Sequence, residues 1–227
     1  MEDVDQVIKR ASETGLVVAE AFMYRHHPQT KIVGEWIESG RLGDILVANG
    51  VFNFKLDDPD NVRLDPEFGG GSLWDVGVYP VSLAQYVMGE APEWVHGDQR
   101  LGETGVDMLF SGQMHYSNRR MALFSSSFWS PFHTHFEIIG TEGRLAMKRP
   151  FVEMDYGQYL TFFPAEGEPV PILVFEKDLY LGEVQDMHNA ILNGWMSYIS
   201  LEETRDHIRT ILALYESAST GEVVHLN

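Results

Sequence analysis

The stretch from residue 94 to 175 alternates short runs of β-branched and aromatic residues with turn signals. Turn-forming residues, such as Ser117-Asn118 and the Gly-Thr-Glu-Gly segment at 140–143, separate the runs. Short strands at this spacing pair as an antiparallel meander. This region therefore restricts the chain to a fold built on a largely antiparallel sheet. The runs expected to form strands are residues 106–116, 121–128, 136–139, 144–148, 159–163 and 172–175.

Helices and two further strands are predicted outside that stretch. The dense apolar run at 16–23 predicts a buried strand, residues 45–55 predict a second strand, and residues 57–71 predict a long loop. The last helix opens with Ser200 and Glu203 at capping-box spacing. We expect one α+β domain over the whole chain, residues 1–227. Apolar residues at helical spacing predict five helices, which end at Gly15, Gly40, Gly89, Gly194 and Gly221.

Bulk composition excludes several classes of function. The 227 residues carry a net charge of −18, which repels nucleic acid and anionic membrane surfaces. No stretch approaches the roughly 18 unbroken apolar residues of a membrane span, and the acidic N-terminus is unlike a secretory signal. Cysteine is absent, which excludes disulfides and thiolate chemistry. We expect a cytoplasmic protein whose partners are small molecules or copies of itself.

The glycine-rich run at residues 69–81 is the strongest candidate for a functional site. It reads Gly-Gly-Gly-Ser-Leu-Trp-Asp-Val-Gly-Val-Tyr-Pro-Val. Three consecutive glycines give up side-chain packing and backbone entropy, so the fold must need bare backbone there. Asp75 and Tyr79 are four residues apart and fall on one face of a helical turn, where both can contact one ligand. The run therefore has the composition of one half of an active site.

Several further motifs stand in the order of a known family. Besides the glycine-rich run and Asn61-Val62-Arg63 before it, they include Glu-Ala-Phe-Met-Tyr-Arg-His-His-Pro at 20–28, Gly-Arg-Leu-Gly at 40–43, and the segments 139–143 and 213–218. With these motifs the chain resembles the Gfo/Idh/MocA family of NAD(P)-dependent oxidoreductases, which act mainly on sugars and related polyols. It is most similar to the dihydrodiol-dehydrogenase and glucose–fructose-oxidoreductase branch. The resemblance covers nearly the whole chain.

The resemblance implies a C-terminal domain with an open sheet, helices packed on one face and a homodimer contact through the other face. Family members carry a Rossmann domain for NAD(P) before this domain, and nothing in the chain matches it. No Gly-x-Gly-x-x-Gly follows a strand, the family's Glu-Lys-Pro motif with its catalytic lysine is missing, and Lys9 lies mid-helix. We therefore expect that the Rossmann domain is absent, that the chain holds no cofactor, and that it is inactive alone.

The resemblance also implies site residues. The aspartate and tyrosine matching Asp75 and Tyr79 form the family's proton-transfer site beside the substrate carbon; the structural alternative is a helix cap and a packed ring. Arg25 and Arg63 carry forked donors that can bind a sugar hydroxyl or carboxylate. For Arg63 the alternative is a solvated side chain. Trp74 can stack on a sugar ring or pack in the core.

Two other groups of residues invite a functional interpretation. His133 and His135 would face the same side of a strand, a spacing that can bind metal. No third ligand has convincing spacing, so no metal site is expected. Further aromatic residues could stack on a sugar, although packing in the core or on the sheet is favoured; they are Phe128, Trp129, Phe132 and Phe136.

Three functions remain open from the sequence. The first is the substrate-binding half of an NAD(P)-dependent sugar or dihydrodiol oxidoreductase, completed by a separate Rossmann chain. The second is a non-enzymatic module that binds a sugar-like ligand or forms a homodimeric scaffold through the sheet face. The third is a cofactor-free isomerisation or elimination at Asp75 and Tyr79, which ranks last because the sequence offers no second strong base nearby.

Overall fold

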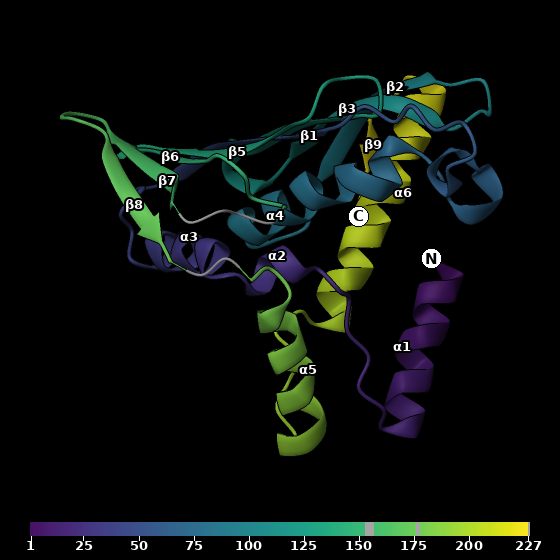
Figure 1. The fold of residues 1–227 in the computed structure, drawn as a ribbon, viewed down its shortest axis with the longest axis horizontal. Coiled ribbons are helices and arrows are strands. Elements are labelled where there is room, and N and C mark those ends of the chain that lie inside the picture. The colour runs from purple at the N-terminus through teal and green to yellow at the C-terminus, as the bar shows by residue number, and fades with distance from the viewer. Residues whose placement is uncertain (153–156, 176–177, 227) are drawn as a thin grey trace.

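Nine strands form one open sheet, and helices cover one of its faces (Figure 1). The computed structural model describes residues 1–152, 157–175 and 178–226. Across the sheet the strands follow the order β8-β7-β6-β5-β1-β4-β3-β2-β9. Among the described residues, β1 and β4 form the one parallel pair. The α+β class and the mostly antiparallel open sheet are therefore as predicted.

Most element bounds lie close to those expected from the sequence. The strands are β1 (Ile45–Asn53), β2 (Trp94–Leu101), β3 (Asp107–His115), β4 (Met121–Ser127), β5 (His133–Gly140), β6 (Gly143–Met147), β7 (Gly157–Pro164), β8 (Val170–Val174) and β9 (Val224–His225). The helices are α1 (Glu2–Thr14), α2 (Met23–His26), α3 (Pro28–Glu38), α4 (Val78–Met88), α5 (Leu181–Asn193) and α6 (Leu201–Thr220). The short helical turns are η1 (Val62–Leu64), η2 (Pro66–Phe68), the π-helix η3 (Leu73–Gly77) and η4 (Ser117–Arg119).

Strand β1 interrupts the predicted meander at the centre of the sheet. It pairs in parallel with β4, from Val47 opposite Met121, and antiparallel with β5 on its other side. A side chain at Gly50 would meet the ring of Pro80 from α4 at 2.5 Å. The bare backbone of β1 thus lets α4 lie close on the sheet, and α4 carries Tyr79.

Strands β2 and β9 are absent from the sequence prediction. The β2 sequence mixes the exposed Asp98 and Arg100 with apolar residues, and only its first half, with the buried Val95, packs in the core. Strand β9 has only two residues and pairs with β2 through Val224 and His225. Such short or polar strands carry little alternation for a sequence pattern to detect.

The predicted strand at 16–23 is wrong. Residues 16–22 follow no regular structure, and the run ends in the short helix α2. Leu16 and Val18 are 70% and 37% exposed. A buried strand needs neighbouring strands to take its backbone hydrogen bonds, and none of the described strands lies beside this segment. The start of the run is therefore exposed, and only Phe22 near its end is buried in the core, although the composition of the whole run is that of a sheet interior.

Helix ends lie where the sequence places them. Gly89 ends α4 in the left-handed conformation, with φ 72°. The Ser200 side chain accepts a hydrogen bond from the Glu203 amide at 3.0 Å, as the capping pattern predicts. No helix within the described residues is long and apolar enough to cross a membrane.

Candidate active site

The three glycines allow the preceding loop to fold back onto its own end. The amides of Gly70 and Gly71 donate to the carbonyl oxygens of Asp65 and Arg63, both at 3.0 Å. A side chain at Gly70 would approach the Arg63 carbonyl oxygen to 2.5 Å. The bare backbone expected from the sequence is thus used to pack the loop, and this packing brings Arg63 next to the glycine-rich run.

Asp107, the first residue of β3, anchors the start of η3. Its buried carboxylate accepts hydrogen bonds from the Ser72 hydroxyl and the Leu73 amide, both at 2.8 Å, and from the Tyr215 hydroxyl at 2.7 Å. Gly71 leaves room for this carboxylate, because a Cβ there would meet Asp107 Oδ1 at 2.2 Å. Sequence analysis missed Asp107; an acid directly before the apolar residues Met108, Leu109 and Phe110 of a predicted strand is the signal that could have found it.

Arg63 and Asp75 form an ion pair across the mouth of the loop. Arg63 Nε lies 2.7 Å from Asp75 Oδ2, and the two side chains are 43% and 25% exposed. Asp75 sits in the π-helix η3, an irregularity that is frequent at functional sites. The structure therefore brings together two of the residues that the sequence selected and leaves both reachable from solvent.

Tyr79 lies one turn further on, in a cluster of aromatic rings. Its ring packs against Phe22 and Phe52 at 5.5 Å and Phe151 at 5.7 Å, and its hydroxyl points toward Met23 Sδ at 3.8 Å. Burial, and then the negative charge of Asp75, raise the pKa of Tyr79 to about 12, while Arg63 opposes the rise. The phenol therefore keeps its proton at neutral pH. We call these three residues the Arg63–Asp75–Tyr79 group.

Trp74 is half-buried beside the same helical turn. Its ring lies 6.0 Å from that of Tyr215, tilted by 35°, and it packs against the hydrophobic core. That Trp74 contacts a substrate stays a prediction.

Arg25 lies apart from the other candidates. Its side chain is 2% exposed, its Nη1 lies 2.5 Å from Glu203 Oε1, and its guanidinium covers the Tyr86 ring at 4.1 Å. The Nε atom is buried without a hydrogen-bond partner among the described residues. In this arrangement Arg25 joins α2, α4 and α6 in the interior, and its predicted contact with substrate remains untested.

A cavity of about 270 Å³ lies between α5 and the segment before α2. Glu183, at the start of α5, is part of its wall, and burial raises the pKa of this carboxyl. Ala21, also in the wall, precedes Phe22, whose ring packs against that of Tyr79 at 5.5 Å. Phe22 thus connects the cavity to the Arg63–Asp75–Tyr79 group, whose three residues are not part of its lining. Its lining residues are Ala19, Glu20, Ala21, His26, Glu183, Val184, Asp186 and Met187.

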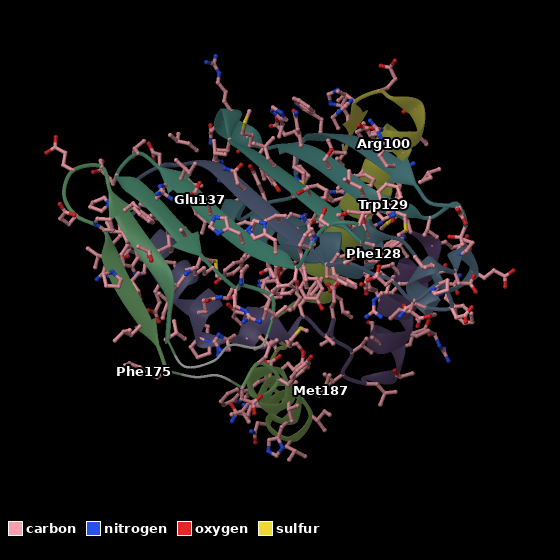
Figure 2. The ribbon with its side chains drawn as sticks, turned by 45° about the horizontal axis from the view of Figure 1, so that its top comes forward. Arg100, Phe128, Trp129, Glu137, Phe175 and Met187 are labelled. Atoms are coloured by element: carbon pink, nitrogen blue, oxygen red, sulfur yellow. The ribbon has the colours of Figure 1, made fainter. Side chains whose placement is uncertain are left out.

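The remaining aromatic and histidine candidates divide between core and surface. Phe128 and Phe136 are buried in the core, as the favoured interpretation holds. Trp129 is 51% exposed, and Figure 2, with the open side of the sheet turned toward the viewer, shows it with Glu137 on that side. The rings of His133 and His135 lie 6.4 Å apart and nearly parallel, on one side of β5 as predicted. Within the described residues no three His, Cys, Asp or Glu side chains could hold a metal together.

Curated relatives place the chain among oxidoreductases. It is 34% identical to the D-xylose 1-dehydrogenase (NADP(+)) 2 of Haloferax volcanii, an alignment that covers 100% of this chain and 70% of the relative. It is 29% identical to the uncharacterized oxidoreductase ORF334 of Rhizobium meliloti, over 97% of this chain and 68% of that relative. Aligned over 81% of this chain and 56% of the relative, it is 26% identical to the dTDP-3,4-didehydro-2,6-dideoxy-alpha-D-glucose 3-reductase of Actinomadura kijaniata.

Solved structures show the same fold. The aldose-aldose oxidoreductase of Caulobacter crescentus, complexed with glycerol, matches with a TM-score of 0.91 at 21% identity, over 99% of this chain and 68% of that one. The model of the GFO/IDH/MocA C-terminal domain matches residues 30–146. The match, the relatives and the fold agree with the resemblance carried by the sequence motifs. The chain therefore belongs to the GFO/IDH/MocA family of oxidoreductases.

Proposed function

We propose that this chain supplies the substrate-binding and proton-transfer part of an NAD(P)-dependent sugar oxidoreductase. The observation that carries the proposal is the Arg63–Asp75–Tyr79 group, in which an oriented ion pair adjoins a half-buried phenol. A phenol whose pKa is about 12 holds its proton at neutral pH, so Tyr79 is suited to donate a proton to an oxygen that gains negative charge. Asp75 holds Arg63 through Nε, and the other N–H groups of this side chain, which is 43% exposed, face solvent. There they can bind a hydroxyl or carboxylate of a sugar.

The described residues do not fit a dinucleotide by themselves. The glycine turn at 69–71 is closed by the carbonyls of Arg63 and Asp65 and by the Asp107 carboxylate, so a pyrophosphate has no access to its amides. No strand followed by Gly-x-Gly-x-x-Gly and a helix occurs in the part of the chain that the structure describes. We infer that a separate dinucleotide-binding unit supplies NAD(P), and that the residues described here are inactive without it.

The surface opposite the sheet supports such a second unit. Leu16 and Val18 are exposed in a segment with the composition of a buried strand, and Val184, Ile191 and Leu192 are 60–67% exposed on α5. In Figure 1, α1 and α5 extend from the same side of the layered body, away from the sheet. Exposed apolar residues gathered on one side of a molecule are a feature of interaction sites.

Ligand titration tests the proposal. We expect D-xylose, the sugar named for the Haloferax relative, to raise the thermal midpoint of this chain, whereas NADPH fluorescence stays unchanged on mixing. Tyr79→Phe and Asp75→Asn should abolish the shift with D-xylose. Tyr198→Phe is the matched control, because its hydroxyl bonds Tyr86 outside the Arg63–Asp75–Tyr79 group. Saturable NADPH binding, or an equal sugar effect in the Tyr79 and Tyr198 variants, contradicts the proposal.

A homodimeric scaffold is the second candidate function. Leu123 and Trp129 are 38% and 51% exposed on or beside the open side of the sheet, which helices leave uncovered. Sheet faces pack against one another when apolar residues line both. Sedimentation equilibrium should show a dimer that Leu123→Glu dissociates. A monomeric wild-type chain at high protein concentration excludes this candidate.

A further inference from the structure

The hydroxyl of Tyr79 meets the sulfur of Met23. In the part of the chain that the structure describes, Met23 Sδ is the one hydrogen-bond acceptor of this hydroxyl, at 3.8 Å. A thioether sulfur is a weak acceptor, so the phenol proton is held loosely. A substrate oxygen, which is a better acceptor, can take over this hydrogen bond. Such an exchange suits a proton donor, and the inferred role of Met23 rests on that proposed function of Tyr79.

Aromatic packing fixes the phenol in front of the sulfur. Four rings lie 5.5–5.7 Å from that of Tyr79, namely those of Phe22, Tyr24, Phe52 and Phe151. Phe22 and Tyr24, on either side of Met23 in the chain, are both buried in the core. Neither the phenol nor the backbone that carries the sulfur can move away without disturbing this packing. A chemical change at Met23 Sδ therefore acts directly on the Tyr79 hydroxyl.

We propose that Met23 is an oxidation site that controls Tyr79, because its sulfoxide binds the phenol proton and keeps it from the substrate. Met23 packs against the core but is only partly buried, so a molecule as small as hydrogen peroxide can reach it. Peroxide transfers one oxygen atom to Sδ: the S–O bond forms, the O–O bond breaks, the sulfur loses two electrons, and water leaves. The product places an oxygen beside the phenol where the weakly accepting sulfur was.

The sulfoxide changes the polarity of this contact. Its oxygen carries a partial negative charge and accepts a stronger hydrogen bond from the phenol than the thioether does. A hydrogen bond donated by the neutral phenol stabilises the protonated form, so oxidation acts in the same direction as the burial that already raises the pKa of Tyr79. Tyr79 then keeps its proton when a sugar oxygen is present. Reduction of the sulfoxide restores the thioether, so the modification is reversible.

A second contact between a tyrosine and a sulfur provides an internal control. The Tyr116 hydroxyl lies 3.7 Å from Met114 Sδ, but both of these residues are buried in the core. We expect that peroxide does not reach this sulfur while the chain is folded. Met196, between α5 and α6 in the chain, is the opposite case, because it is 94% exposed. Its oxidation therefore reports when the peroxide treatment is complete.

NMR of the chain labelled with ¹³C at the tyrosine Cζ atoms tests the proposal at neutral pH. Peroxide is added until peptide mass spectrometry shows complete oxidation of Met196. We expect a sulfoxide at Met23 and a shifted Tyr79 resonance, which its loss in Tyr79→Phe assigns, while the Tyr116 resonance stays in place. The D-xylose concentration that gives half of the thermal shift should rise about fivefold, the factor for one hydrogen bond of about 1 kcal/mol. Methionine sulfoxide reductases should reverse both changes.

Met23→Leu is the decisive variant, because leucine has a similar apolar volume and no sulfur. Peroxide should leave its Tyr79 resonance and its response to D-xylose unchanged, whereas Met196→Leu, the matched control, should respond as the wild-type chain does. A Met23 that stays reduced after complete oxidation of Met196, an unchanged Tyr79 resonance in the oxidised wild-type chain, or an equal shift in Met23→Leu overturns the proposal. Failure of D-xylose to stabilise the untreated chain contradicts the proposed function instead, and the Tyr79 resonance still tests Met23.

Discussion

Replacing Asp107 with alanine should lower the free energy of unfolding by about 4 kcal/mol. The carboxylate is 2% exposed and accepts three hydrogen bonds, from Ser72, Leu73 and Tyr215. Ser72 keeps an alternative partner, because its hydroxyl lies 3.0 Å from that of Ser126. The Leu73 amide and the Tyr215 hydroxyl lose their acceptor, and hydrogen bonds to a charged group contribute about 1.5–3 kcal/mol each. Relief of the burial that raises the pKa of Asp107 offsets part of this sum.

Asparagine at the same position separates hydrogen bonding from charge. Its carbonyl oxygen, in the place of Oδ2, can accept from the Leu73 amide and the Ser72 hydroxyl, and the Tyr215 hydroxyl can rotate to accept from its amide. We therefore expect Asp107→Asn to cost only about 1–2 kcal/mol. Urea unfolding followed by tryptophan fluorescence gives both values, and Asp98→Ala on the exposed side of β2 should cost less than about 0.5 kcal/mol. Equal costs for alanine and asparagine, or a cost below about 1 kcal/mol for alanine, refute the reasoning.

Three further changes have defined outcomes. Asp75→Asn should lower the pKa of Tyr79 from about 12, because the charge of Asp75 adds to the effect of burial in raising it; NMR of ¹³C-labelled tyrosine measures this pKa. In the wild-type chain, the free energy of unfolding should fall as pH rises above 10, because the phenol of Tyr79 loses its proton at lower pH in the unfolded chain than in the folded one. Gly70→Ala should cost about 2 kcal/mol or more in urea unfolding, since its Cβ meets a backbone carbonyl. Arg25→Met should lower the free energy of unfolding by about 2–3 kcal/mol. Breaking a fully buried ion pair would cost more, but Glu203 is 34% exposed and water can solvate its charge. An unchanged urea midpoint contradicts this prediction.

Local patterns predicted most elements of this fold. The strands between 106 and 175 are short, with turn residues between them, and neighbours in sequence are neighbours in the sheet except for β4 and β5, which β1 separates. The position of β1 could not be predicted, because its partners β4 and β5 lie far along the chain and strand composition does not encode pairing. The prediction of a strand at 16–23 was wrong for a related reason: an apolar run indicates burial, but it does not show whether a neighbouring strand is there to pair with it.

The sequence predicted which residues belong to the candidate site better than it predicted what those residues contact. Asp75, Tyr79 and Arg63 were chosen from one motif and lie together. Arg25 belongs to a motif of the same family, yet its partner Glu203 comes from the last helix, far beyond any local pattern. The role of Asp107 could not be predicted, because its three partners, the Leu73 amide and the hydroxyls of Ser72 and Tyr215, are brought together only by the fold.

The place of β1 also sets a constraint on how the chain can fold. Val47 pairs with Met121 of β4 on one side and with Ile139 of β5 on the other. Both partner strands are synthesised about 70 residues or more after β1, so β1 has no partner when it leaves the ribosome. Non-local pairing of this kind slows folding and leaves apolar strand edges exposed in the meantime. We expect β4 to pair first with β3, and β5 with β6, and the sheet to close around β1 afterwards. Assembly of the centre is therefore expected to be the slow step of folding.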